Sequence, residues 1–214
     1  RVAAGDTLPG GARSLVHVVF AVPHLKGVVF TYLSLALAAV AGALAAGGSP
    51  LVVALCVAAG VLYWSLLEYL IHRFVLHWEP TVGWQQAIRR RINSHSGHHK
   101  RPERREAYVN PHLLIGLAVG LGFPPLLLLI GFPLPVALAI AAGSYVGYVL
   151  TEYLHAALHV LPMKGSAYAR ALYRFHAIHH YRDERYNHAV VFPPWDYVFG
   201  SAFRPRRARA RRAA

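Results

Sequence analysis

Four nearly uncharged, apolar stretches constrain this chain more than any other feature, because each is close to the length at which a helix crosses a lipid bilayer. A spanning helix needs about 20 residues. The stretches are Val28–Ala46, Leu51–Leu70, Leu113–Ile130 and Leu134–Leu154. Turn-forming sequences, 47–50 and 131–133, join the first stretch to the second and the third to the fourth. We therefore predict an all-α integral membrane fold with four transmembrane helices in two hairpins.

The charged residues lie outside these stretches and outside the short turns, with Glu68 and Glu152 as the exceptions. Of the 22 lysines and arginines, three precede the first stretch, eight lie from Arg73 to Arg105 and eleven follow from Lys164 onward. Basic residues favour the cytoplasmic side of a membrane, so we predict that both termini and both long polar segments are cytoplasmic. The net charge of +13 in a chain that is 56% hydrophobic is then a topology signal, and we do not expect nucleic-acid binding.

Histidine is the unusual residue of this chain, because ten of the 14 histidines form four tight groups. Positions three and four apart lie on one face of a helix, so each H-x-x-H-H triplet can direct imidazoles to one point. The first pair, five residues apart, diverges by about 140° on an ideal helix. Its members therefore either serve different metals or flank a helix distortion. The groups are His72 and His77; His95, His98 and His99; His155 and His159; and His176, His179 and His180.

These groups indicate a metal centre. Imidazole binds zinc, copper, iron and nickel, whereas calcium and magnesium prefer oxygen ligands. Ten imidazoles exceed the four ligands of a structural zinc site, while two metals with about five nitrogens each would leave coordination positions open for dioxygen. The single cysteine, Cys56, lies inside an apolar stretch, so a thiolate site is not expected. We therefore predict two metal ions, because this is the smallest number that can use all ten imidazoles.

Two carboxylates accompany the histidine groups. Glu68 and Glu152 precede His72 and His155 by about one helical turn, at the ends of apolar stretches where a carboxylate is costly. Each could accept the free ring N–H of a metal-binding histidine and so fix its tautomer. Direct ligation of the metal, or an ion pair with Arg73, is the alternative.

The two halves of the chain resemble each other. The sequence Glu-Tyr-Leu-Ile-His ends one hairpin at 68–72, and Glu-Tyr-Leu-His ends the other at 152–155. Each is followed by a second histidine and later by an H-x-x-H-H triplet. We interpret this as a tandem repeat in which each unit supplies half of one site.

At this level of detail the chain resembles the fatty acid hydroxylase and sterol desaturase superfamily of integral-membrane di-metal oxygenases, and within it the fatty acid 2-hydroxylase branch. The resemblance covers roughly Val28 to Ser201. It rests on E-Y-L-I-H-R-F at 68–74, H-x-x-H-H-K-x-P at 95–102, G-Y-V-L at 147–150, H-H-Y at 179–181 and W-D-Y-V-F-G at 195–200.

The resemblance implies a four-helix membrane region capped by a cytosolic, histidine-rich helical region, with all ten grouped histidines as metal ligands. It also implies two iron ions that activate dioxygen, for which zinc can substitute in purified protein. Many eukaryotic 2-hydroxylases carry a cytochrome domain on the same chain. Because we find none in this sequence, we expect a separate electron donor, a b-type cytochrome or a ferredoxin.

One stretch departs from the 2-hydroxylase pattern. Asn187, His188 and Ala189, followed by V-V-F-P at 190–193, resemble the end of the sterol desaturase branch. His188 and Asn187 are therefore additional candidate site residues, and the departure bears on the identity of the substrate.

These observations predict three parts: an N-terminal segment, 1–27, that can lie along the membrane interface, a membrane di-metal hydroxylase domain, 28–201, and a polybasic tail, 202–214. The predicted reaction is hydroxylation of a C–H bond of a lipid acyl chain that enters from the bilayer, with carbon 2 of a fatty acid or sphingolipid as the leading target. One alternative is hydroxylation or desaturation of a sterol, carotenoid or other lipid. Others are a structural zinc protein and a metal transporter, whose ligands would lie near the bilayer midplane.

Overall fold

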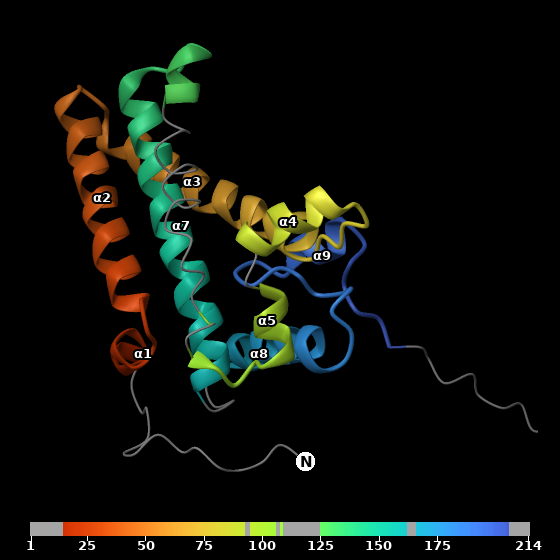
Figure 1. Ribbon diagram of the computed structural model, residues 1–214. Coiled ribbons are helices and arrows are strands. Elements are labelled where there is room, and N and C mark those ends of the chain that lie inside the picture. Colours follow the sequence, from red (N-terminus) through yellow and green to blue (C-terminus); the bar gives the residue numbers. More distant parts are fainter. Residues whose placement is uncertain (1–14, 93–94, 106–107, 109–124, 162–165, 206–214) are drawn as a thin grey trace, which may run out of the picture.

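The computed structural model describes residues 15–92, 95–105, 108, 125–161 and 166–205, and the regular elements in these ranges are all helical. The long helices are α2 (Leu25–Ala45), α3 (Pro50–Ile71), which continues into the π-helical turn η1 (His72–Leu76), and α7 (Leu134–Val160). The shorter helices gather beside one end of α7 and around the end of α3, except α1, which lies at the foot of α2 (Figure 1). They are α1 (Leu15–Ala21), α4 (Gly83–Ile92), α5 (His95–Lys100), α8 (Ala167–Tyr181) and α9 (Pro194–Val198).

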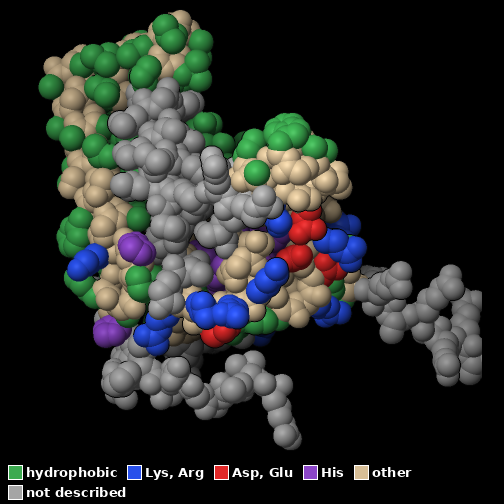
Figure 2. All heavy atoms as spheres, in the orientation of Figure 1, with side chains coloured by type: hydrophobic (Ala, Val, Ile, Leu, Met, Phe, Trp, Pro, Cys, Tyr) green, Lys and Arg blue, Asp and Glu red, His purple; other side chains and the backbone are tan. Residues whose placement is uncertain are grey.

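Three helices are long and apolar enough to cross a membrane, over Leu25–Ala45, Pro50–Leu76 and Leu134–Val160. They match the first, second and fourth predicted spans, and the chain is an integral membrane protein with several apolar helices. The third predicted span, 113–130, lies largely outside the described residues, although 125–129 is helical. Figure 2 shows apolar side chains over the upper part of the helices, whereas Lys, Arg, Asp and Glu side chains collect toward the opposite end.

The central helix is α7, which packs against both α2 and α3, whereas α2 and α3 contact each other little within the described residues. In the apolar stretch of α7, 56% of the residues are buried, whereas 22% are buried in the corresponding stretch of each of the other two long helices. Aromatic rings fill these seams: the ring of Tyr148 on α7 lies 4.6 Å from that of Tyr32 on α2 and 5.2 Å from that of Trp64 on α3. Among the described helices, the best-packed pairs therefore join different predicted hairpins.

A pair of glycines forms the crossing of α3 and α7. A Cβ atom added to Gly60 would lie 2.9 Å from the Cα of Gly143, and a Cβ on either glycine would collide with the backbone of the other helix. Small residues of this kind allow membrane helices to approach closely. Each glycine lies twelve residues before the first histidine of its repeat, His72 or His155, so the crossing sets the distance between the two histidine-bearing helix ends.

Candidate metal centre

The first histidine pair lies on a distorted helix. At the end of α3 the backbone N–H of His77 donates to the carbonyl of His72 at 3.2 Å, an i to i+5 bond that makes η1 a π-helical turn. The extra residue in this turn brings the two rings onto the same side, with their Nε2 atoms 3.3 Å apart. Of the two alternatives left open by the spacing, the helix distortion is therefore the one that occurs. π-Helical turns of this kind are frequent at functional sites.

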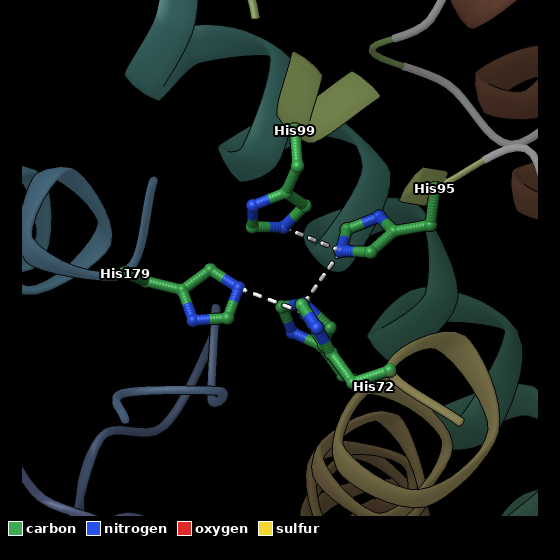
Figure 3. Close-up of side chains that lie close together, drawn as sticks. His72, His95, His99 and His179 are labelled. Atoms are coloured by element: carbon green, nitrogen blue, oxygen red, sulfur yellow. Dashed lines mark hydrogen bonds between the residues drawn. The ribbon is translucent and has the colours of Figure 1, made fainter. Parts of the chain in front are cut away.

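Five imidazoles form a first cluster. One ring nitrogen of each lies within 4.8 Å of those of the others, and neighbouring Nε2 atoms are 2.9 to 3.3 Å apart. Four of the rings are turned toward a common point in Figure 3. The members of this cluster are His72, His77, His95, His99 and His179.

A second cluster contains His98, His155, His159 and His180, again with one nitrogen of each within 4.8 Å of the others. The Nε2 of His98 lies 3.1 Å from that of His155 and 3.1 Å from that of His159. His176 borders this cluster, because its Nε2 is 2.9 Å from that of His159 and its ring centroid is 4.4 Å from that of His180. The structure thus gathers nine of the ten grouped histidines into two clusters and places His176 beside the second.

The two halves of the chain exchange one histidine each. His95 and His99 of the first triplet join the cluster of their own half, but His98 joins the second cluster. In the second triplet, His176 and His180 lie in or beside the second cluster, while His179 crosses to the first. Each half of the chain therefore supplies most of one cluster, and the middle histidine of each triplet joins the cluster of the other half, so the sharing is not the half-and-half division that we expected.

Burial keeps these imidazoles neutral, as a metal ligand must be. It lowers the pKa of His77 to about 3 and that of His99 to about 4, with smaller effects from neighbouring imidazoles. The pKa of His180 is lowered further by burial and by His176. Among the described residues, both ring nitrogens of His180 and Nδ1 of His98 are buried without a hydrogen-bond partner. Buried, unpartnered imidazole nitrogens are costly unless something binds them, and a metal ion fits that requirement.

Backbone carbonyls orient three of the clustered rings. Nδ1 of His179 donates to the carbonyl of Tyr186 at 2.7 Å, and Nδ1 of His155 donates to that of Tyr108 at 2.8 Å. Nδ1 of His72 likewise donates to a carbonyl of residue 188. Because a carbonyl can only accept, each bond fixes the tautomer and leaves the lone pair of Nε2 directed into the cluster.

Comparison with known proteins decides the family. The family model described as Fatty acid hydroxylase matches residues 57–201, which is more than half of the chain. This range includes both histidine clusters. The chain belongs to the fatty acid hydroxylase family.

Members of the fatty acid hydroxylase family with assigned activities are similar to this chain over much of its length. Fatty acid 2-hydroxylase from Homo sapiens is 34% identical over 141 residues, which cover 65% of this chain and 37% of that protein. Dihydroceramide fatty acyl 2-hydroxylase FAH2 from Arabidopsis thaliana is 32% identical over 149 residues, covering 70% of this chain and 61% of that protein. The chain therefore spans 37% of the human protein's length.

A solved structure supports the same relationship. Full-length scs7p, in which only the hydroxylase domain is visible, matches this member of the fatty acid hydroxylase family with a TM-score of 0.67 and 28% sequence identity. The match covers 91% of this chain and 68% of that chain. The helical arrangement around the two clusters is thus shared with an experimentally observed hydroxylase domain.

Both predicted glutamates are buried, Glu68 on α3 and Glu152 on α7. The carboxylate of Glu68 accepts from the backbone N–H of Val190 at 3.2 and 3.3 Å and lies 3.9 Å from Nδ1 of His72, which donates to a carbonyl instead. Glu152 is buried on α7, but the nitrogens of His155 are directed to a carbonyl and to another imidazole. Backbone carbonyls thus accept the ring N–H groups of His72 and His155, and the predicted role of Glu68 and Glu152 in supporting these histidines stays a prediction.

His188 and Asn187 separate into two roles. The buried ring of His188 lies beside the first cluster, with its centroid 5.7 Å from that of His72 and 5.3 Å from that of His179. The amide of Asn187 is engaged by the backbone: Nδ2 donates to the carbonyl of Phe175 at 3.1 Å, and Oδ1 accepts from the N–H of Phe203 at 2.8 Å. The Asn187 amide thus bonds the backbone, and its predicted place in the site stays a prediction, whereas the ring of His188 lies beside the first cluster.

Proposed function

We propose that this chain is the membrane domain of a di-iron oxygenase that hydroxylates carbon 2 of a fatty acyl chain, in a free fatty acid or a ceramide. The observation that carries this is the pair of buried imidazole clusters at the ends of apolar helices, in a chain similar to 2-hydroxylases. The balanced reaction adds one oxygen atom of dioxygen to the C–H bond and reduces the other to water, consuming two electrons and two protons.

The ten histidines are the proposed ligands. Five would hold one ion through the first cluster, and His98, His155, His159, His176 and His180 would hold the other. When bound, two iron ions would supply the one-electron redox chemistry that dioxygen activation requires. Zinc binds imidazole sites more tightly than ferrous iron, so protein purified without added iron should contain zinc.

The residues around the clusters support this chemistry in two ways. Carbonyl acceptors keep the ring of His155 and the rings of His72 and His179 in one tautomer, so the site needs little rearrangement when it binds metal. Burial excludes water from the reacting atoms. Because His72 and His155 lie near the ends of membrane-spanning segments, an acyl chain in the bilayer would have its carboxyl end, and thus carbon 2, at the depth of the metals.

The orientation follows from the charges. We place both termini and the metal centre on the cytoplasmic side, because the basic residues lie in the termini and in the two long polar segments. A separate b-type cytochrome or ferredoxin would deliver the electrons there, attracted by the positive charge of this face.

Two alternative functions, a metal transporter and an oxygenase with another lipid substrate, make different predictions. A metal transporter should hold its ligands near the bilayer midplane, whereas the histidine-bearing helices α5 and α8 lie beside the ends of α3 and α7 (Figure 1). Desaturation, or hydroxylation of a sterol or carotenoid, would use the same metal centre. The sequence around His188, which resembles the sterol desaturase branch, supports these alternatives.

Lipid mass spectrometry of cells with and without the expressed gene tests the proposal. We expect a new pool of acyl lipids heavier by one oxygen at carbon 2, labelled when the cells grow under isotopic dioxygen. His98→Ala should abolish this pool, and His17→Ala, an exposed histidine on α1, should leave it intact. Loss of two hydrogens would indicate desaturation, and an unchanged lipid profile would reject both activities.

A further inference from the structure

The segment 186–190 passes beside the first cluster and gives backbone carbonyls to two of its histidines. The carbonyl of Tyr186 accepts from Nδ1 of His179, which α8 supplies, and the carbonyl of His188 accepts from Nδ1 of His72 at the end of α3. One short stretch of backbone therefore orients ligands from both halves of the chain. The position of this backbone should matter for the first metal.

Buried carboxylates hold the N–H groups of the same segment. Asp196, which is fully buried, accepts from the N–H of His188 at 2.9 Å and from that of Ala189 at 2.8 Å. Glu68 accepts from the next N–H, that of Val190. Three successive N–H groups thus face carboxylates.

One peptide group links a carboxylate to a metal-binding imidazole. The N–H of Ala189 and the carbonyl of His188 belong to the same peptide unit, so the N–H bonds Asp196 while the carbonyl accepts from His72. Hydrogen bonds in such a chain polarise one another. A negative charge on the N–H side makes the carbonyl a stronger acceptor, which makes the imidazole a better donor to a metal, as a directly bonded carboxylate would.

We propose that Asp196 is a positioning residue for the first metal, acting through the peptide group between His188 and Ala189. The proposal rests on the metal centre proposed above. It also predicts that Asp196 supports only one of the two proposed metals. In the second cluster, Nδ1 of His155 donates to the carbonyl of Tyr108, which lies outside the segment 186–190.

The test measures metal retention by the purified full chain in detergent, loaded with zinc and dialysed against a graded chelator. We expect wild type to hold two ions. Asp196→Asn keeps the size but removes the charge and one acceptor, so one ion should bind roughly 10- to 100-fold more weakly while the other is retained. Ser201→Ala is the matched control, because the Ser201 hydroxyl also donates a hydrogen bond to Asp196, at 2.7 Å. Its loss leaves the hydrogen bonds from the N–H groups of His188 and Ala189 to Asp196 in place, so this variant should keep both ions.

Double variants identify the affected site. Asp196→Asn combined with His179→Ala, both acting on the first cluster, should hold one ion, whereas Asp196→Asn combined with His98→Ala should hold neither firmly. Equal weakening of both ions, or of neither, in Asp196→Asn would overturn the inference. If that variant does not fold, Asp196→Glu, which keeps the charge but displaces the oxygens, is judged by the same criterion. A wild-type protein that fails to hold two ions would instead reject the proposed di-metal function.

Discussion

His98 and His179 occupy the same position in their triplets, and each faces the cluster of the opposite half. Removing His179 should therefore weaken the ion held mainly by the first half, and removing His98 the ion held mainly by the second. We expect His179→Ala and His98→Ala each to lower the affinity for one ion by at least about tenfold. Cobalt titration of each variant, followed by its absorption spectrum, measures the remaining site.

Comparing the spectra of single variants tests whether His98 and His179 each join the cluster of the opposite half. His179→Ala should resemble His95→Ala in the spectrum of the remaining cobalt, and His98→Ala should resemble His155→Ala. If His179→Ala matches His155→Ala instead, the two triplets do not exchange their middle histidines.

Protonation of the buried histidines should destabilise the metal-free protein in acid. The pKa of His77 falls to about 3 and that of His99 to about 4 in the folded state, against 6.5 when unfolded. The unfolded state then binds more protons below pH 6.5, so stability is retained above that pH and lost as pH falls toward 4 and 3. Each group contributes at most about 1.4 kcal/mol per pH unit.

The measurement is the thermal midpoint of chelator-treated protein in detergent between pH 8 and about 4. The midpoint should be level above pH 6.5 and fall below it, and His77→Gln, which removes one titrating group, should make the fall shallower. A midpoint that rises on acidification would show that these rings are not buried as neutral groups.

At the level of single residues, the sequence predicted which histidines would gather but not how they would be held. Spacing shows that His95, His98 and His99 share a helix face, yet it cannot tell which cluster each ring enters. The partners of the rings are backbone carbonyls, which every residue possesses, so no side-chain pattern marks Tyr108 or Tyr186. Asp196 appears in the sequence only as part of a W-D-Y motif, without a sign of what it binds.

The helix elements show why the pair at 72 and 77 was ambiguous. The divergence of about 140° holds for an ideal α-helix, and the π-helical turn η1 removes it by inserting one residue into the turn. In the second half, His155 and His159 reach the same kind of arrangement on a regular α-helix, because they are four apart. The two repeats thus use different backbone geometry to produce similar pairs.

The glycine crossing of α3 and α7 gives a prediction for the elements. In Gly143→Ala the new Cβ would meet the backbone of α3, so the helices must separate, at a cost of about 1–3 kcal/mol. Because these helices carry His72 and His155, the thermal midpoint and the occupancy of both metals should fall. Gly27→Ala, where the Cβ meets nothing within 4 Å, is the control and should leave both unchanged. Equal behaviour of the two variants would refute this role for the crossing.

For the molecule as a whole, the hairpin topology is testable. The turn between α2 and α3 and the turn just before α7 lie at the upper end of the helices in Figure 1, away from α5 and α8. We predict that reporter tags in these two turns, at Gly48 and Phe132, are extracytoplasmic, whereas tags at Glu103 and at the C-terminus are cytoplasmic. Tags at Gly48 and Glu103 that report the same side would contradict the two-hairpin arrangement.

The overall architecture was more predictable than the packing. Length and hydropathy located the three described spans, because the bilayer fixes how many apolar residues a helix needs. The packing partners were not evident, since α7 joins α2 and α3 across hairpins through contacts such as that of Tyr32 with Tyr148. Apolar stretches that are hydrophobic on all sides do not reveal which face meets a neighbour.

The exchange of His98 and His179 also bears on the history of the chain. Two identical subunits related by a twofold axis would each lend the other the same residue, and Gly60 and Gly143 would meet near that axis, as they do at the crossing. Fusion of two such subunits by gene duplication would produce this arrangement within a single chain. Because fusion removes the requirement that the two halves be identical, one half can contain a π-helical turn while the other keeps a plain helix. The two proposed metals would then have different chemical environments within one polypeptide.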